Sequence, residues 1–168
     1  ALCTSSTTYF IQTANIDLGG SGSPWAPIQL YGQYDGGNFN ISNLYINSTV
    51  AGGLYFGLFS TINVSAGVQN VNLTNVSVTT AGAGTGALAG SVSGSVINCT
   101  SNGTVASGST ITQNILMGGL IGTVASGGSV LNSSSTASVT WGGSSGTNII
   151  VNIGGLIGAV NAGAGAIT

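Results

Sequence analysis

The chain repeats itself about every 30 residues, and this periodicity limits the fold more than any other feature of the sequence. Four leucines in similar Gly-containing blocks are spaced by 30, 32 and 36 residues: Leu58, Leu88, Leu120 and Leu156. A second block, Val-x-Asn, recurs at similar intervals and ends at Asn70, Asn98 and Asn132. Periods of about 20–50 residues are typical of solenoids, in which each unit stacks on its neighbour and buries its apolar face there.

Within one repeat the pattern is that of β-strands. Residues 71–78 largely alternate Val or Leu with Asn, Thr or Ser, and a period of two rich in β-branched residues predicts strands. The 30 glycines punctuate such runs, as expected of corners that need positive φ or close backbone contact. We therefore predict one all-β domain over residues 1–168, a parallel β-solenoid with Gly-rich corners. Residues 1–50 would form aromatic-rich first coils, and residues 51–168 the Gly-Leu-Ile-Gly-type repeats.

The phase of the repeat also predicts two columns of stacked side chains. The four leucines are expected to point inward, one per coil, as a ladder of core residues. Asn70, Asn98 and Asn132 align with one another, and stacked asparagine amides can hydrogen-bond along the axis of a β-stack. We expect these three residues to form an internal ladder.

Charge is almost absent from the chain. It has two carboxylates, Asp17 and Asp35, and no Lys, Arg or His, whereas an average domain is about 25% charged. Binding to nucleic acid or to anionic lipid depends on Lys and Arg, so neither partner is expected. A net charge close to zero promotes association. Bound glycans would keep such a chain soluble, and permanent assembly into a polymer would remove the need for solubility.

Neither a membrane span nor a metal site is predicted. The most apolar stretch, residues 149–160, contains Asn152 and three glycines, and a spanning helix needs about 18 uninterrupted apolar residues. Metal sites need histidines or clustered carboxylates, which this composition lacks. Two interpretations of Cys3 and Cys99 stay open: a disulfide, with each other or with a neighbouring subunit, or a small buried hydrophobe at Cys99.

The two carboxylates are the only pair that could perform acid–base catalysis. A glycosidase places two carboxyl groups around one bond, and Asp17 and Asp35 are close enough in sequence to lie on adjacent coils. Asp35, however, precedes two glycines, a context in which aspartate caps its own turn. No cation is present to stabilise developing negative charge, and no histidine to activate a nucleophile. We predict no catalytic residues, no cofactor and no enzyme activity.

Eight asparagines stand in Asn-x-Ser/Thr sequons, the acceptor sequence for N-glycosylation. Six of them are predicted to carry glycans: Asn40, Asn47, Asn63, Asn72, Asn75 and Asn102. The other two, Asn98 and Asn132, belong to the expected internal ladder and are predicted to stay unmodified. Glycans would supply the solubility that the missing charges do not.

Aromatic residues concentrate in the first third of the chain: Tyr9, Phe10, Trp25, Tyr31, Tyr34, Phe39, Tyr45, Tyr55, Phe56 and Phe59. Their flat faces would suit the apolar faces of sugars, so a carbohydrate platform is one interpretation. The other is a bulky plug over the first coils, because the end repeats of a solenoid must differ from the inner ones. We favour the plug, since buried aromatic side chains dominate the energetics of a core.

The order of these motifs resembles that of bacterial GLUG-repeat surface proteins. Residues 9–18, 25–28 and 34–46 resemble the opening of that family, and Gly-Leu-Ile-Gly at 119–122 and 155–158 resembles the repeat that names it. The family includes filamentous adhesins and non-catalytic β-helical regions of IgA-protease-like chains. The resemblance implies a right-handed parallel β-helix at a cell surface.

Together these features predict a non-enzymatic structural glycoprotein outside the cell, a subunit of a surface filament, sheath or layer. The alternative is an adhesin domain that binds carbohydrate or matrix. Residues 149–168 offer no Lys to guard an open β-edge, and unguarded edges invite pairing. We therefore expect this end to dock against copies of the chain or against other surface proteins.

Overall fold

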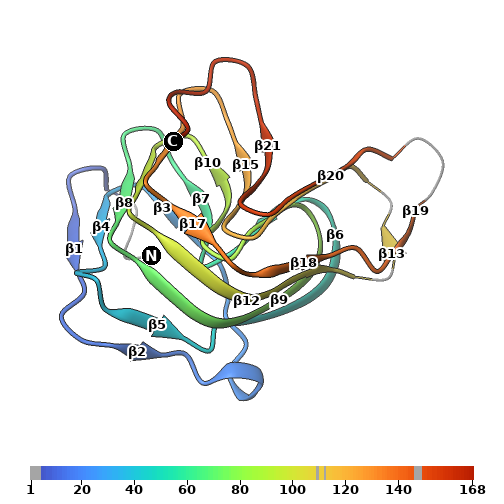
Figure 1. Ribbon diagram of the computed structural model, residues 1–168, viewed down its shortest axis with the longest axis horizontal. Helices are drawn as coiled ribbons and strands as arrows, with labels where there is room; N and C mark the ends of the chain where they lie inside the picture. Colours follow the sequence, from blue (N-terminus) through green and yellow to red (C-terminus); the bar gives the residue numbers. More distant parts are fainter. Residues whose placement is uncertain (1–4, 109, 112, 146–148) are drawn as a thin grey trace.

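The computed structural model describes residues 5–108, 110–111, 113–145 and 149–168 of the 168-residue chain. These residues form β-strands and one short 3-10 turn, η1 (Gly20–Gly22). The strands stack in parallel as a β-solenoid of about four turns. Successive coils follow the same path, so that β9 (Asn72–Thr85), β12 (Thr100–Ser107) and β18 (Ser138–Thr140) run side by side (Figure 1). The predicted fold class is confirmed.

Three parallel sheets enclose the interior, and each coil contributes to all of them. Sheet 1 consists of β1 (Tyr9–Ile11), β4 (Gln33–Asp35), β8 (Gly67–Gln69), β11 (Ser95–Ile97) and β16 (Ser129–Leu131). Sheet 2 consists of β3 (Ile28–Leu30), β7 (Phe59–Ile62), β10 (Ala89–Val92), β15 (Ile121–Val124) and β21 (Ile157–Val160). The order along each sheet is the order of the coils, from the N-terminal end to the C-terminal end.

Sheet 3 is the longest wall of the solenoid. Besides β9, β12 and β18 it contains β2 (Ile16–Asp17), β5 (Asn40–Ser42), β6 (Tyr45–Phe56), β14 (Ile115–Gly118), β17 (Ser134–Ser135) and β20 (Val151–Gly154). In the later coils an excursion interrupts this wall, and there β13 (Thr110–Ile111) pairs with β19 (Ser144–Ser145). This excursion explains why the repeat lengthens toward the C-terminal end.

The register places equivalent residues in columns that run through the coils. One column of sheet 1 contains Phe10, Tyr34, Val68, Val96 and Val130. One column of sheet 2 contains Leu30, Ile62, Val92, Val124 and Val160. The inner members of both columns are buried, whereas Val160 in the last coil is 52% exposed. Apolar residues at every second strand position thus build the core, as the alternating pattern requires.

Glycines bring sheets 2 and 3 close together. Gly90, Gly122 and Gly158 follow one another in successive coils of sheet 2. A Cβ on Gly122 would lie 2.6 Å from the carbonyl oxygen of Gly90 and would also meet the backbone of Thr85. This region therefore packs by backbone contact, where a side chain would not fit.

The four leucines of the repeat lie just before the strands of sheet 2. Leu58, Leu88 and Leu120 are buried, and Leu156 in the last coil is half-buried. Consecutive coils are joined here by backbone hydrogen bonds, from Leu88 N–H to Leu120 O (2.9 Å) and from Leu120 N–H to Leu156 O (3.0 Å).

Candidate functional site

Both carboxylates lie in the first coils and accept several hydrogen bonds. Asp17 Oδ1 accepts from the Gly19 N–H (2.9 Å) and from Asn43 Nδ2 (2.8 Å). Asp35 Oδ1 accepts from the Gly37 N–H (2.9 Å) and from Asn70 Nδ2 (3.0 Å). The bonds to Gly19 and Gly37 are the local turns that aspartate forms with the backbone two residues later.

A second oxygen of Asp35 is engaged as well. Its Oδ2 accepts from Gln69 Nε2 (2.8 Å) and from the Tyr9 hydroxyl (3.4 Å). The hydrogen bonds to Gly37, Asn70 and Gln69 hold the pKa of Asp35 below its ordinary value. Hydrogen bonds from Asn43 and Gly19 lower the pKa of Asp17 in the same way.

This direction of shift opposes acid catalysis. A general acid that works near neutral pH needs a raised pKa, which burial in an apolar site provides. Asp17 and Asp35 are solvated, hydrogen-bonded and held in the charged form. Their neighbours are amides and backbone N–H groups, which explains both carboxylates as structural acceptors.

Two columns of asparagine begin at these carboxylates. In the first, Asn98 Nδ2 donates to Asn70 Oδ1 (3.2 Å), and Asn70 Nδ2 donates to Asp35. In the second, Asn75 Nδ2 donates to Asn43 Oδ1 (2.7 Å), and Asn43 Nδ2 donates to Asp17. We call these the Asp35 ladder and the Asp17 ladder. Each amide passes a hydrogen bond toward the N-terminal coil, and a carboxylate, which only accepts, ends the chain of donors.

The ladder asparagines share one backbone conformation. Their φ angles are positive, from 53° to 59° at Asn43, Asn70, Asn75 and Asn98, and 49° at Asn132. Asparagine tolerates the left-handed region better than other residues with a side chain. Each of these residues therefore turns the chain at a corner or bend and at the same time supplies an amide to the neighbouring coil.

The structure corrects the expected position of the Asn70, Asn98 and Asn132 column. Asn98 and Asn132 are exposed and Asn70 is half-buried, so the ladder runs along the outer surface and not inside. The left-handed corner turns these side chains outward, whereas the preceding Val68, Val96 and Val130 point into the core. Asn132 aligns with Asn98 because the preceding residues, Leu131 and Ile97, pair in sheet 1. Its own N–H donates to Thr168 O (2.9 Å).

The Asp17 ladder was not identified from the sequence. Its signal was present: Asn43, Asn75 and Asn102 each follow Ser or Thr and precede an apolar or Gly residue. Asn102 closes this column differently, since its Oδ1 accepts from the Asn75 N–H (2.8 Å) at a register shift between β9 and β12. The ladder role of Asp17 and Asp35 was also missed, because each stands one position before the asparagine column.

Cys99 is fully buried, and its thiol donates to Ile97 O (3.3 Å). Burial raises the pKa of the Cys99 thiol to about 11, which leaves little reactive thiolate at neutral pH. Cys99 thus acts as a small core residue. Cys3 lies outside the described residues, and the predicted alternatives for it stay open.

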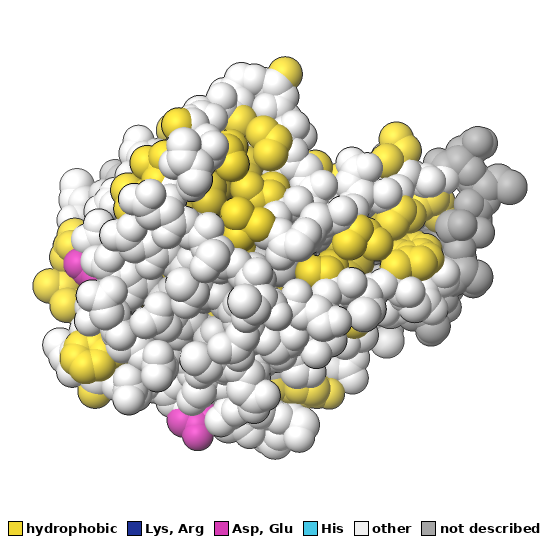
Figure 2. Space-filling view, viewed as in Figure 1, with side chains coloured by type: hydrophobic (Ala, Val, Ile, Leu, Met, Phe, Trp, Pro, Cys, Tyr) yellow, Lys and Arg dark blue, Asp and Glu magenta, His cyan; other side chains and the backbone are white. Residues whose placement is uncertain are grey.

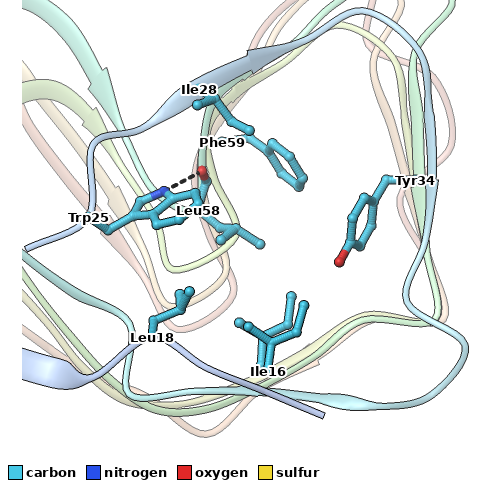
Figure 3. A pocket seen from close by; sticks show the side chains of 8 residues that line it. Ile16, Leu18, Trp25, Ile28, Tyr34, Leu58 and Phe59 are labelled. Atoms are coloured by element: carbon cyan, nitrogen blue, oxygen red, sulfur yellow. Dashed lines mark hydrogen bonds between the residues drawn. The ribbon is translucent and has the colours of Figure 1, made fainter. Parts of the chain in front are cut away.

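An apolar cavity opens at the N-terminal end of the core (Figure 3). It measures about 290 Å³ and is lined by Ile16, Leu18, Trp25, Ile28, Tyr34, Ile41, Leu58 and Phe59. Trp25 Nε1 donates to Leu58 O (2.9 Å), and the Tyr34 ring meets Phe59 edge-on with centroids 5.8 Å apart. The Tyr34 hydroxyl donates to Gln12 Oε1 (3.1 Å). Trp25, Tyr34 and Phe59 thus lie at this end of the core, whereas Tyr9, Phe39 and Tyr55 of the predicted plug are exposed.

The described residues contain no group of three or more His, Cys, Asp or Glu side chains that would suit a metal ion. Within the same residues, no helix has the length and apolar character that crossing a membrane requires.

The sequon asparagines all lie in the described part of the chain. Six of the eight are exposed and two are half-buried. The exposed ones are Asn40, Asn47, Asn75, Asn98, Asn102 and Asn132, and the half-buried ones are Asn63 and Asn72. Exposure alone therefore does not separate the six predicted sites from the two predicted to be unmodified.

Comparisons with known proteins agree with this fold. No family model matches the chain. Over 103 residues, 61% of the chain, the sequence is 40% identical to halomucin of Haloquadratum walsbyi, and the match spans 1% of that protein. The structure resembles the crystal structure of a candidate immunoglobulin A1 protease from Bacteroides ovatus, with a TM-score of 0.60. That match covers 98% of this chain and 59% of the other at 19% identity, so it shows the β-solenoid fold alone.

Proposed function

We propose that this chain is a non-enzymatic structural glycoprotein of an extracellular surface, and that copies of it stack end to end in a filament, sheath or layer. We also propose that its Gly-Leu-Ile-Gly blocks are GLUG-type repeats. The match to a protein named as a mucin supports a glycosylated surface protein. The hydrogen-bonded, low-pKa carboxylates support a role without acid–base catalysis.

The observation that carries the stacking proposal is where exposed apolar residues lie. Eleven of the thirteen large exposed hydrophobic residues in the described chain lie on or beside strands at the N-terminal or C-terminal edge of a sheet. At the N-terminal end these are Tyr9, Ile11, Ile16, Ile28, Val50, Leu54 and Tyr55, and at the C-terminal end Ile150, Ile153, Val160 and Ile167. Figure 2 shows apolar side chains gathered beside β21 and between β18 and β20.

Two physical effects favour covering these ends. An end strand leaves N–H and C=O groups of its ladder without a β-partner, and an added strand satisfies them. Burying exposed apolar surface is also favourable by about 25 cal/mol per Å². Between chains with two acidic groups and no basic ones, long-range repulsion does not prevent close approach.

A matched pair of valines tests this proposal. Val160 is 52% exposed on the end strand β21, and Val64 is 70% exposed on a side loop. In sedimentation experiments on the purified chain, Val160→Asp should abolish the oligomers, because it places a charge on the stacking edge. Val64→Asp should leave the oligomers unchanged. If the unsubstituted chain stays monomeric at high concentration, or if both variants act alike, end-to-end stacking is wrong.

Imaging of native surface material provides the second test, since a regular polymer is expected. The alternative, a carbohydrate-binding adhesin, predicts saturable glycan binding that is lost in Trp25→Ala. The cavity beside Trp25 favours this less, because its lining is apolar and the Tyr34 hydroxyl is already bonded within the protein.

A further inference from the structure

The chemistry of N-glycosylation uses one atom of each sequon. The sugar is bonded to the side-chain amide nitrogen, Nδ2, of asparagine. In the folded protein this nitrogen must therefore point into solvent, with room beside it for a sugar ring. The eight sequons differ in this respect, although their sequences are of one type.

Four sequon asparagines use Nδ2 to bind another coil. Asn63 donates to Leu30 O (3.0 Å) and Asn72 to Asn38 O (3.1 Å). In the Asp17 ladder Asn75 donates to Asn43 Oδ1 (2.7 Å), and in the Asp35 ladder Asn98 donates to Asn70 Oδ1 (3.2 Å). In each case Nδ2 faces the neighbouring coil, so a sugar attached there would need the space that this coil fills.

The other four are exposed and their Nδ2 atoms make no hydrogen bond to any described residue: Asn40, Asn47, Asn102 and Asn132. Asn102 shows how the backbone sets this orientation. Its Oδ1 accepts from the Asn75 N–H (2.8 Å), and the two polar atoms of an amide point in different directions, so Nδ2 is turned away from the sheet. Asn47 follows the buried Ile46 on β6 and so lies on the outer side of that strand.

We propose that N-linked glycans are carried by Asn40, Asn47, Asn102 and Asn132, and not by Asn63, Asn72, Asn75 and Asn98. This inference rests on the proposed extracellular function and specifies which side chains make the chain a glycoprotein. It changes the sequence prediction at Asn63, Asn72 and Asn75, whose amides are engaged. It also changes the prediction at Asn132, which the outer position of the ladder leaves open to solvent.

Site mapping of the protein purified from its native host tests the assignment. Digestion with chymotrypsin or pepsin is needed, because the chain has no Lys or Arg for trypsin. Glycopeptide mass spectrometry should find glycans confined to the four free-amide asparagines. A glycan on Asn63, Asn72, Asn75 or Asn98 would overturn the assignment, and so would a protein with no glycan at all.

A matched pair of hydroxyl substitutions sharpens the test. Thr104→Ala removes the sequon of Asn102 but keeps the Asn102 side chain, and Ser77→Ala does the same for Asn75. Both hydroxyl residues are exposed on the long sheet. Expressed in the native host, Thr104→Ala should lose the mass of one glycan, and Ser77→Ala should change only by the mass of its oxygen. The reverse result would contradict the inference.

This test and the stacking test fail separately. Oligomers formed by protein from the native host that carries no glycans would overturn the glycan assignment and leave the stacking proposal intact. Glycans at the four sites of a strictly monomeric chain would support the assignment and overturn the filament.

Discussion

Residues 118–122 and 154–158 have the same sequence, Gly-Gly-Leu-Ile-Gly, yet they lie in different environments. All five residues of the first copy are buried, and those of the second are half-buried or exposed. Both copies form the same bend between sheet 3 and sheet 2. The difference arises because another coil covers the first copy and none of the described residues covers the second. Local sequence thus sets the shape of a coil, and the neighbouring coil sets its burial.

The largest expected effect is at the leucine of this pair. Leu120 is 0% exposed, and Leu120→Ala should lower the free energy of unfolding by about 2–5 kcal/mol, the range for cavities in a packed core. Leu156→Ala should cost less than about 2 kcal/mol, since only part of its side chain is removed from water. Denaturant titration of dilute, monomeric protein measures both. Equal losses would show that burial does not distinguish the two copies.

The second glycines of the two copies, Gly119 and Gly155, should give the next largest contrast. A Cβ on Gly119 would meet Gly155 O and the Ser135 side chain, whereas a Cβ on Gly155 would meet nothing within 4 Å. Gly119→Ala should therefore destabilise the protein by about 1–3 kcal/mol, as overpacking does. Gly155→Ala should be neutral in the monomer. Thermal melts of the two variants compare them directly, and a destabilised Gly155→Ala would contradict the free space beside Gly155 in the described structure.

The ladder allows the same comparison at smaller scale. Asn98 and Asn132 both have positive φ, so replacing either by Ala costs about the same backbone strain. Only Asn98 donates its amide to a ladder partner within the described residues. Asn98→Ala should therefore be the worse of the two by about 0.5–1.5 kcal/mol, the net value of one hydrogen bond. The measurement needs unglycosylated recombinant protein. Equal melting temperatures of Asn98→Ala and Asn132→Ala would show that the ladder hydrogen bond does not contribute to stability.

The smallest expected effect is that of pH near neutrality. The pKa values of Asp17 and Asp35 are lowered in the folded state, so their contribution is complete above about pH 4 and is lost as pH falls through the folded values. Burial raises the pKa values of Tyr34 and Cys99, so their contribution is lost above about pH 9. Melting temperature should be flat between about pH 5 and 8. Asp17→Asn with Asp35→Asn should weaken the acid dependence, and a slope near pH 7 would contradict these assignments.

The sequence was sufficient for the fold because a solenoid repeats its constraints. The 30- to 36-residue spacing and the alternation of Val with polar residues predict parallel stacking without any long-range information. Side-chain direction at the corners was harder. A period shows that Asn70, Asn98 and Asn132 stack, but the sign of φ decides whether they face in or out, and the expected internal position was wrong.

The candidate site was less predictable for a related reason. Asp17 and Asp35 lie one register position before the asparagines that bind them, so an alignment of identical residues does not bring them together. The division of the sequons depends on which amide nitrogen faces a neighbouring coil. That orientation follows from the three-dimensional bend at each asparagine, and the Asn-x-Ser/Thr pattern does not encode it.

The carboxylates that end the two ladders also make the charge distribution of the molecule asymmetric. Both negative charges lie in the first coils, on β2 and β4, and the donated hydrogen bonds of both ladders point toward them. Two copies joined by their N-terminal ends would bring four like charges together with no cation to offset them. Two copies joined N-terminal end to C-terminal end place each pair of charges against an uncharged surface. Head-to-tail stacking of this protein would therefore give a polar fibre whose two ends differ.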